Sequence, residues 1–158
     1  MTCKIVDLWH ESDRALDALM GGVKKPFYLG HHNIVSVDRE GILLPNGLHI
    51  RYPQLQLKDG KKVYTSRRGD IGIWGGAVVE NVVQALARII VGEQMCTLAN
   101  MGLRPVLTVH DAAVCLVPEN AVEEHLEQIV KVMSTPPEWA SSLPVACEAK
   151  FGQSYGVC

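Results

Sequence analysis

Residues 106–117 read Val-Leu-Thr-Val-His-Asp-Ala-Ala-Val-Cys-Leu-Val, and this stretch decides the fold that the sequence predicts. Two apolar runs flank the polar pair His110-Asp111, which predicts two strands joined by a tight turn. Both runs are apolar enough to be sheet core, where a buried and unpaired aspartate would be costly. We therefore expect Asp111 to lie at the turn, to be paired, or to bind a cation.

An acid at the tip of a tight hairpin can present one oxygen ligand to Mg²⁺, a hard cation that keeps several of its waters. A His-Asp dipeptide by itself is a weak signal, because most such pairs form structural turns. The metal role therefore depends on what surrounds residues 106–117 in the sequence.

Three stretches have apolar residues at the spacing of one helix face. The first covers about residues 4–20, and Gly21-Gly22 stops it. The second runs from Val78 to about Met95, and the third follows Pro118-Glu119-Asn120 and ends at Pro136-Pro137. The apolar face of the second helix consists of Val79, Val82, Val83, Leu86, Ile89 and Ile90.

The second helix also carries a polar stripe. Its members share one side of the helix because of their spacing, and they are Glu80, Asn81, Gln84 and Arg88. A polar stripe normally faces solvent. This one is short of charge and holds two amides, so a recognition surface is the alternative.

Residues 34–65 change to a strand-like pattern that predicts a small, exposed β-meander. Turns are expected at Asp38–Gly41, at Pro45-Asn46-Gly47 and at Asp59-Gly60, and Asn-Gly is a strong hairpin signal because both residues tolerate positive φ. A last short strand is expected near residues 144–150. The strand after the second turn alternates as a half-buried strand should, with Leu48, Ile50 and Tyr52 against His49 and Arg51.

Composition limits the functional classes. The chain has 158 residues and is 47% hydrophobic, which suits one compact domain. Its net charge of -2 excludes a strongly basic protein, so contact with DNA would use a local patch or neutral donors. One basic cluster is either a solvated surface or a surface that meets a phosphate backbone, and it holds Lys58, Lys61, Lys62, Arg67 and Arg68.

The sequence favours a protein of a reducing cytoplasm. No apolar run reaches the roughly 18 residues needed to cross a bilayer, and the N-terminus lacks the layout of a signal peptide. The five cysteines are odd in number, widely spread and without a C-x-x-C pair. Neither a disulfide framework nor a zinc site is therefore expected.

Several segments resemble family A DNA polymerases, the phage branch in particular, and they occur in that family's order. Val109-His110-Asp111 is similar to motif C, usually Val-His-Asp-Glu, and Gln84-Ala85-Leu86-Ala87-Arg88 resembles the helix that precedes it. The likeness runs over almost the whole chain. The other matching segments are Leu44–Leu48 with Arg51-Tyr52-Pro53, Trp74-Gly75-Gly76 with Glu80-Asn81, Met133–Ala140, and Glu148 with Gly152 and Tyr155-Gly156.

The resemblance implies a fold of the α+β class. The chain would be the carboxyl-terminal part of a DNA-directed DNA polymerase, with helices packed against an antiparallel palm sheet that contains the motif C hairpin. Residues 1–74 would be a helix and β-hairpins from the fingers side, and residues 75–158 would be palm. The protein would act in the host cytoplasm if a phage encodes it.

The resemblance also implies site residues and partners. Asp111 would be the catalytic residue of this chain and would hold Mg²⁺ with a second aspartate outside it, as two-metal nucleotidyl transfer requires. His110 and Gln84 would contact primer-template DNA, where neutral donors suit minor-groove acceptors that every base pair offers. The incoming dNTP is the other expected partner. The remaining expected DNA contacts are Asn81, Arg88, Arg67 and Arg68.

The sequence departs from the family's pattern at points that matter for activity. It contains neither an Asp-Tyr-Ser-like motif A strand nor a lysine-bearing motif B helix. Ala112 replaces the usual motif C glutamate, Ala77 stands where lysine is common, and Ile89 where aspartate is common. We expect the chain alone to be inactive. It would need a separate polypeptide with motifs A and B, or would self-associate through surface that the absent strand leaves exposed.

Two other functions stay open. The chain could be a non-catalytic palm remnant that binds DNA or a partner protein. It could instead be a metal-dependent hydrolase that uses His110 and Asp111, although the remaining histidines show no ligand spacing such as H-x-x-x-H.

Overall fold

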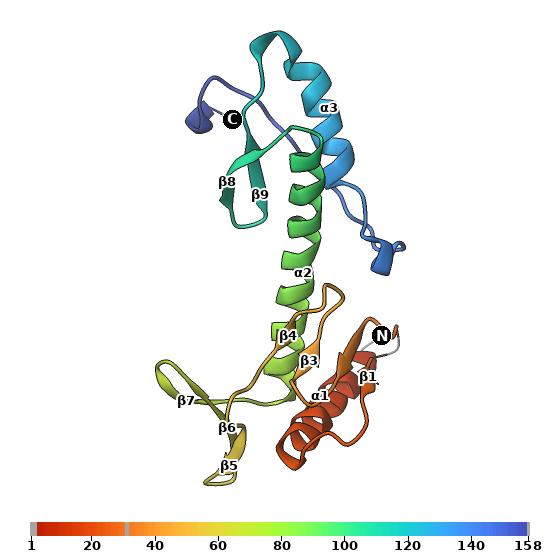
Figure 1. The fold of residues 1–158 in the computed structure, drawn as a ribbon, viewed down its shortest axis with the longest axis vertical. Helices are drawn as coiled ribbons and strands as arrows, with labels where there is room; N and C mark the ends of the chain where they lie inside the picture. The colour runs from red at the N-terminus through yellow and green to blue at the C-terminus, as the bar shows by residue number, and fades with distance from the viewer. Residues whose placement is uncertain (1–2, 31, 158) are drawn as a thin grey trace. The chain divides into compact units, whose positions relative to one another are not determined.

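The computed structural model describes residues 3–30 and 32–157. Within them the chain is an α+β protein with antiparallel sheets, as the sequence predicts (Figure 1). Contacts divide the chain into two compact units, residues 1–86 and 87–158, whereas the sequence suggests one compact body. The functional division at residues 74 and 75 stays a prediction. Each unit is described below by itself.

The first unit is built from α1 and a four-stranded antiparallel sheet. Helix α1 (Cys3–Gly21) is followed by Gly22, whose φ of 77° lies in the left-handed region that favours glycine. Leu16 of α1 is fully buried in the same core as Val37 and Ile42, so this core joins the helix to the sheet. The strands lie in the order β1 (Phe27–Leu29), β2 (Val35–Val37), β3 (Ile42–Leu43) and β4 (His49–Ile50).

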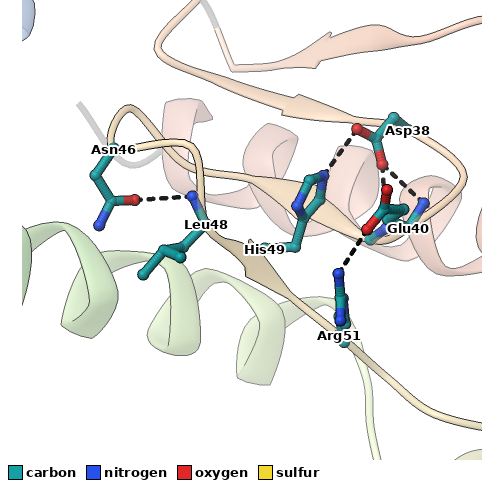
Figure 2. A network of polar contacts seen from close by, with 7 residues as sticks. Asp38, Glu40, Asn46, Leu48, His49 and Arg51 are labelled. Atoms are coloured by element: carbon teal, nitrogen blue, oxygen red, sulfur yellow. Dashed lines mark hydrogen bonds and ion pairs between the residues drawn. The ribbon is translucent and has the colours of Figure 1, made fainter.

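A polar network holds the turn between β2 and β3 against β4 (Figure 2). The Asp38 carboxylate accepts the backbone N–H groups of Glu40 and Gly41 at 2.8 and 3.2 Å, and its other oxygen lies 2.8 Å from His49 Nε2. This bond to His49 is the main cause that lowers the pKa of Asp38 below its ordinary value. Arg51 pairs with Glu40 at 2.5 Å, so both ends of the turn are tied to the neighbouring strand.

A second, three-stranded antiparallel sheet also belongs to the first unit. It is largely exposed, and Leu57 and Ile71 are 64% and 40% exposed. The expected exposed meander over residues 34–65 is thus confirmed only in this sheet. Val35, Val37 and Ile42 of the first sheet are buried because α1 packs on them. The ion pair between Lys58 Nζ and Asp70 Oδ2, at 2.9 Å, joins its two outer strands. Its strands are β5 (Gln56–Lys58), β6 (Lys61–Ser66) and β7 (Gly69–Gly72), in that order.

Helix α2 (Gly75–Asn100) begins in direct backbone contact with α1. The N–H of Gly75 donates to Asp13 Oδ1 at 3.1 Å, and Lys62 Nζ lies 3.2 Å from the same oxygen. A Cβ added at Gly75 would collide with the carbonyl oxygen of Trp9. One carboxylate of α1 therefore binds both β6 and the first turn of α2.

The length and composition of α2 would suffice for a membrane span. An 18-residue window of the helix has a mean hydropathy of 1.3, and 22% of that window is buried. Contrary to the expectation from the sequence, this helix is apolar enough over 18 residues, because its charged residues Glu80, Arg88 and Glu93 are few and far apart. A core helix of a soluble protein meets the same criterion, so this single helix is weak evidence of a membrane.

The second unit has a small core around the end of α2. Leu98, Leu103 and Met133 are its buried members. The buried amide of Gln94 donates to the carbonyl oxygens of Met133 and Thr135, at 2.9 and 3.1 Å. These bonds satisfy carbonyl groups at the carboxyl-terminal end of α3 that have no partner within the helix. The elements are β8 (Pro105–Val109), β9 (Ala112–Cys115), η1 (Glu119–Ala121), α3 (Val122–Met133), η2 (Glu138–Ala140) and η3 (Tyr155–Val157).

The structure corrects three expectations about local order and burial. Residues 144–150 form no strand, and no neighbouring segment in the described chain pairs with them. Leu48 is 64% exposed because it belongs to a turn that precedes a strand of only two residues. Val83 is 57% exposed, since the buried side of α2 is narrower than its apolar composition suggests.

Candidate active site and nucleic-acid contacts

The predicted hairpin around His110-Asp111 is present in the second unit. Strands β8 and β9 are antiparallel, and Val109 pairs with Ala112, so His110 and Asp111 are the whole turn. His110 has a φ of 56°, in the left-handed region that non-glycine residues rarely adopt. This conformation costs backbone energy, and such strain often marks functional turns. The expectation that Asp111 lies at a turn is confirmed.

The Asp111 side chain is exposed. Within residues 3–30 and 32–157 it has neither a hydrogen bond nor an ion pair, so its carboxylate has no structural task in this chain. Its oxygens are free to accept a cation or a proton donor from outside.

The strands beside this turn are not sheet core, contrary to the expectation from their apolar sequence. Val106 and Leu107 of β8 are 58% and 47% exposed, and Leu116 after β9 is 76% exposed. The reason is that β8 and β9 form a sheet of only two strands in the described chain. Only one side of β9 packs on the small core, through Ala113 and Cys115. The other side of the hairpin exposes apolar side chains, and the outer edges of both strands have backbone groups that pair with no further strand in the described chain.

A complete metal site does not occur in the part of the chain that the structure describes. No group of three His, Cys, Asp or Glu side chains there could hold a metal ion. Asp111 fits Mg²⁺ as a single exposed carboxylate, because this ion keeps waters and takes only one or two protein carboxylates. Around this turn, the described chain therefore offers one exposed carboxylate.

The polar stripe of α2 is divided between structural and free side chains. Asn81 Nδ2 donates to the hydroxyl of Tyr52 at 3.1 Å, so this amide is used inside the first unit. Burial raises the pKa of that Tyr52 hydroxyl, while the bond from Asn81 acts to lower it. Gln84 is exposed and donates to Glu80 at 3.2 Å, and Arg88 is exposed. Gln84 and Arg88 stay available for DNA, whereas Asn81 would have to leave its partner.

The predicted pairing of Gln84 with His110 on one DNA remains a prediction. Gln84 belongs to the first unit and His110 to the second. Each side chain is exposed in its own unit, as a DNA contact requires.

Arg67 and Arg68 form the tip of another hairpin. Ser66 pairs with Gly69 across β6 and β7, which leaves the two arginines as the turn. The Ser66 hydroxyl donates to the carbonyl oxygen of Gly69 at 2.9 Å and accepts the N–H of Arg68 at 3.1 Å. Both arginine side chains are exposed, so this tip presents two cations on a fixed backbone.

Comparison with known proteins identifies one curated relative. The chain is 33% identical, over 159 aligned residues, to the DNA polymerase of Bacillus phage SP02. It is related to a phage DNA polymerase. The match covers 92% of this chain and 24% of the relative, so the chain spans about a quarter of that polymerase. No protein-family model matches the chain. No solved structure matches it either.

The phage polymerase relationship supports the resemblance seen in the sequence at the level of DNA polymerase. Its coverage is broad, since nearly the whole chain matches and not the hairpin alone. The sequence did not reveal the contacts of Asp38 with His49 or of Asp13 with Gly75, because these pairs are 11 and 62 residues apart.

Proposed function

We propose that this chain is the carboxyl-terminal palm part of a family A DNA polymerase and serves template-directed nucleotidyl transfer. The observation that carries the proposal is the match of 92% of the chain to a phage DNA polymerase. The exposed, unpartnered Asp111 at a two-residue turn supports it, because a metal-binding acid must be reachable by substrate.

In this proposal Asp111 is the catalytic residue of the chain. It holds Mg²⁺ together with a second aspartate from a motif A strand outside this sequence. Mg²⁺ held there would supply the positive charge that activates a primer 3′-hydroxyl and stabilises a pyrophosphate leaving group. The task of the hairpin is to hold the Asp111 carboxylate at a fixed place, and the backbone ladder of β8 and β9 does this up to Val109 and Ala112.

The DNA contacts in the proposal come from side chains that are exposed in each unit. His110 and Gln84 act as neutral donors toward minor-groove acceptors of the primer-template, which do not depend on sequence. Arg67, Arg68 and Arg88 meet phosphates, where each cation releases counterions. Asn81 is the weakest member of this set, because its amide is bonded to Tyr52.

The partner in the proposal is a stretch of protein that carries motifs A and B. It fits the second unit through the two-stranded sheet, whose edges pair with no other strand of the described chain and whose β8 residues Val106 and Leu107 are exposed. A strand added to such an edge gains main-chain hydrogen bonds and covers the apolar side chains. Without it, a second copy of the chain is the expected occupant.

Primer extension tests this proposal. The chain is mixed with a polypeptide that carries motifs A and B of a related phage polymerase, together with primer-template, dNTP and Mg²⁺. Extension is expected only from the mixture. If the mixture does not extend the primer while the chain still binds primer-template, the catalytic proposal is wrong.

The alternative is a non-catalytic palm module. Ala112, next to Asp111 and in place of the usual motif C glutamate, is the observation that favours it. This alternative predicts that Asp111→Ala changes neither DNA binding nor any activity of the reconstituted mixture.

A further inference from the structure

The first unit carries an exposed surface that the proposed function does not use. It lies at strand β1, which is an outer strand of its sheet and follows α1 in the chain (Figure 1). Two consecutive aromatic side chains are exposed there, Phe27 at 37% and Tyr28 at 60%. Aromatic rings of this size normally contribute to a core, so two exposed neighbours require an explanation.

A hollow of about 250 Å³ accompanies these rings. It is lined by Glu11, Arg14, Phe27, Tyr28, Leu29 and Gly30. Glu11 already accepts the N–H of Gly30 at 3.0 Å, which satisfies part of its charge. Arg14 is exposed and has no hydrogen bond or ion pair in the described chain, so its guanidinium is available to a ligand.

Further cations lie in the segment before β1. Lys24 and Lys25 are exposed, and neither is bonded within the described residues. Arg39 Nε donates to the carbonyl oxygen of Val23 at 3.2 Å, which places this guanidinium beside the same segment. The surface therefore combines exposed rings with several cations, although the chain as a whole has a net charge of -2.

From this combination we infer that the surface around Tyr28 binds single-stranded nucleic acid. In this inference a base stacks on the ring of Tyr28, and the phosphates are held by Arg14, Lys24 and Lys25. Phe27 precedes Tyr28 in the same strand and therefore faces the other side of the sheet. Aromatic platforms flanked by cations are how single strands are bound without sequence preference. A duplex fits less well, since its base faces are covered by their neighbours in the stack. A protein partner fits less well too, because lysine is depleted in protein interfaces.

This inference goes beyond the proposed function and does not depend on Asp111. It concerns a surface in the first unit, needs no metal and makes no statement about catalysis. Binding of single strands and primer extension can therefore succeed or fail independently.

The test uses the full chain and two fluorescent oligonucleotides of equal length, oligo(dT) and its abasic counterpart, without Mg²⁺. The two carry the same phosphates, and only the first has bases. We expect oligo(dT) to bind roughly tenfold more tightly than the abasic strand, from stacking on at least one ring. Tyr28→Ala should remove that difference, whereas Tyr28→Phe should keep it. Arg14→Ala should weaken both strands alike and make binding less dependent on salt.

The matched control is Leu57→Ala, which removes an exposed apolar side chain from the other sheet of the same unit and should leave both affinities unchanged. Circular dichroism shows whether each variant remains folded. If Tyr28→Ala does not fold, the affinities of Arg14→Ala for the two strands still test the inference. Equal binding of oligo(dT) and the abasic strand to the wild-type chain would overturn the inference. So would a preference that survives in Tyr28→Ala, or a duplex that binds as tightly as oligo(dT) with the same dependence on Tyr28.

Discussion

The β6–β7 and β8–β9 hairpins share one backbone plan and carry opposite chemistry. Each is an antiparallel pair closed by a two-residue turn whose side chains are exposed. The first turn is Arg67-Arg68, and the hydroxyl of Ser66 fixes it. The second is His110-Asp111, in which His110 takes a left-handed φ of 56°. The backbone geometry of a hairpin thus sets the position of a tip residue. The charge of its side chain decides whether a phosphate or a cation can be bound there.

The largest expected effect comes from removing the acid of the second turn. Asp111→Asn should lower primer extension by the reconstituted polymerase more than about 100-fold, because even residues that only support a metal ligand contribute 10–100-fold. Steady-state extension at saturating Mg²⁺ measures it. The control is Asp59→Asn, an acid at another hairpin turn with a φ of 51°, which should keep full activity. Equal activity of the two variants would mean that Asp111 contributes no more to catalysis than Asp59 does.

The next effect concerns the strained residue of the same turn. His110→Val should destabilise the second unit by about 1–2 kcal/mol, because a β-branched residue resists the left-handed conformation. His110→Asn should be nearly neutral, since asparagine adopts this conformation readily. Urea unfolding followed by circular dichroism gives both values. If valine is tolerated as well as asparagine, the turn is not held at its left-handed φ.

The contribution of the Arg67-Arg68 turn should appear in the salt dependence of DNA binding. Changing Arg67 and Arg68 together to alanine should weaken binding to primer-template about tenfold at low salt and lower the slope of log K against log[salt] by about 2. Fluorescence anisotropy over a series of salt concentrations measures both quantities. Lys61→Ala, which removes an exposed cation at the other end of β6, serves for comparison and should change the slope by no more than about 1. An unchanged slope in the double variant would leave the arginines as solvated surface.

The smallest effect is on the acid stability of the β5–β7 sheet. The hydrogen bond from Lys58 lowers the pKa of Asp70 below its ordinary value of 3.8. A group whose pKa is lower in the folded state stabilises the fold above the unfolded pKa, and this contribution is lost as pH falls through the folded value. Asp70→Asn should therefore reduce the loss of stability between about pH 4 and more acidic values. Unfolding curves at pH 3 and pH 6 compare the two proteins, and the β8–β9 hairpin should be unaffected.

The hairpin turns of the chain also show how far the sequence could predict this fold. Asp59-Gly60 and His110-Asp111 were expected turns, because their residues tolerate unusual φ or interrupt apolar runs. The turn at Arg67-Arg68 was not expected, since it contains no residue typical of turns and depends on the Ser66 hydroxyl. The strand expected near residues 144–150 does not form, because a strand requires a partner and none pairs with it in the described chain.

Burial was harder to predict than local structure, and the site shows why. The flanks of Asp111 are apolar, which indicates a core, but β8 and β9 pair with no third strand in the described chain, and burial depends on such a neighbour. Asn81 was assigned to a recognition stripe by its spacing, whereas its amide is bonded to Tyr52, 29 residues away. Periodicity reports which side chains share a face, and only the tertiary structure determines what that face meets.

The contact between Gly75 and the backbone of Trp9 restricts how this protein can change over generations. There is no room at residue 75 for even a methyl group, so alanine there would push α1 away from the start of α2. The carboxylate of Asp13 would then lose its hydrogen bond from the N–H of Gly75 and its ion pair with the ammonium of Lys62. A lineage that replaces this glycine would have to move its first helix in the same step, which makes the position a point of entrenchment for the whole first unit.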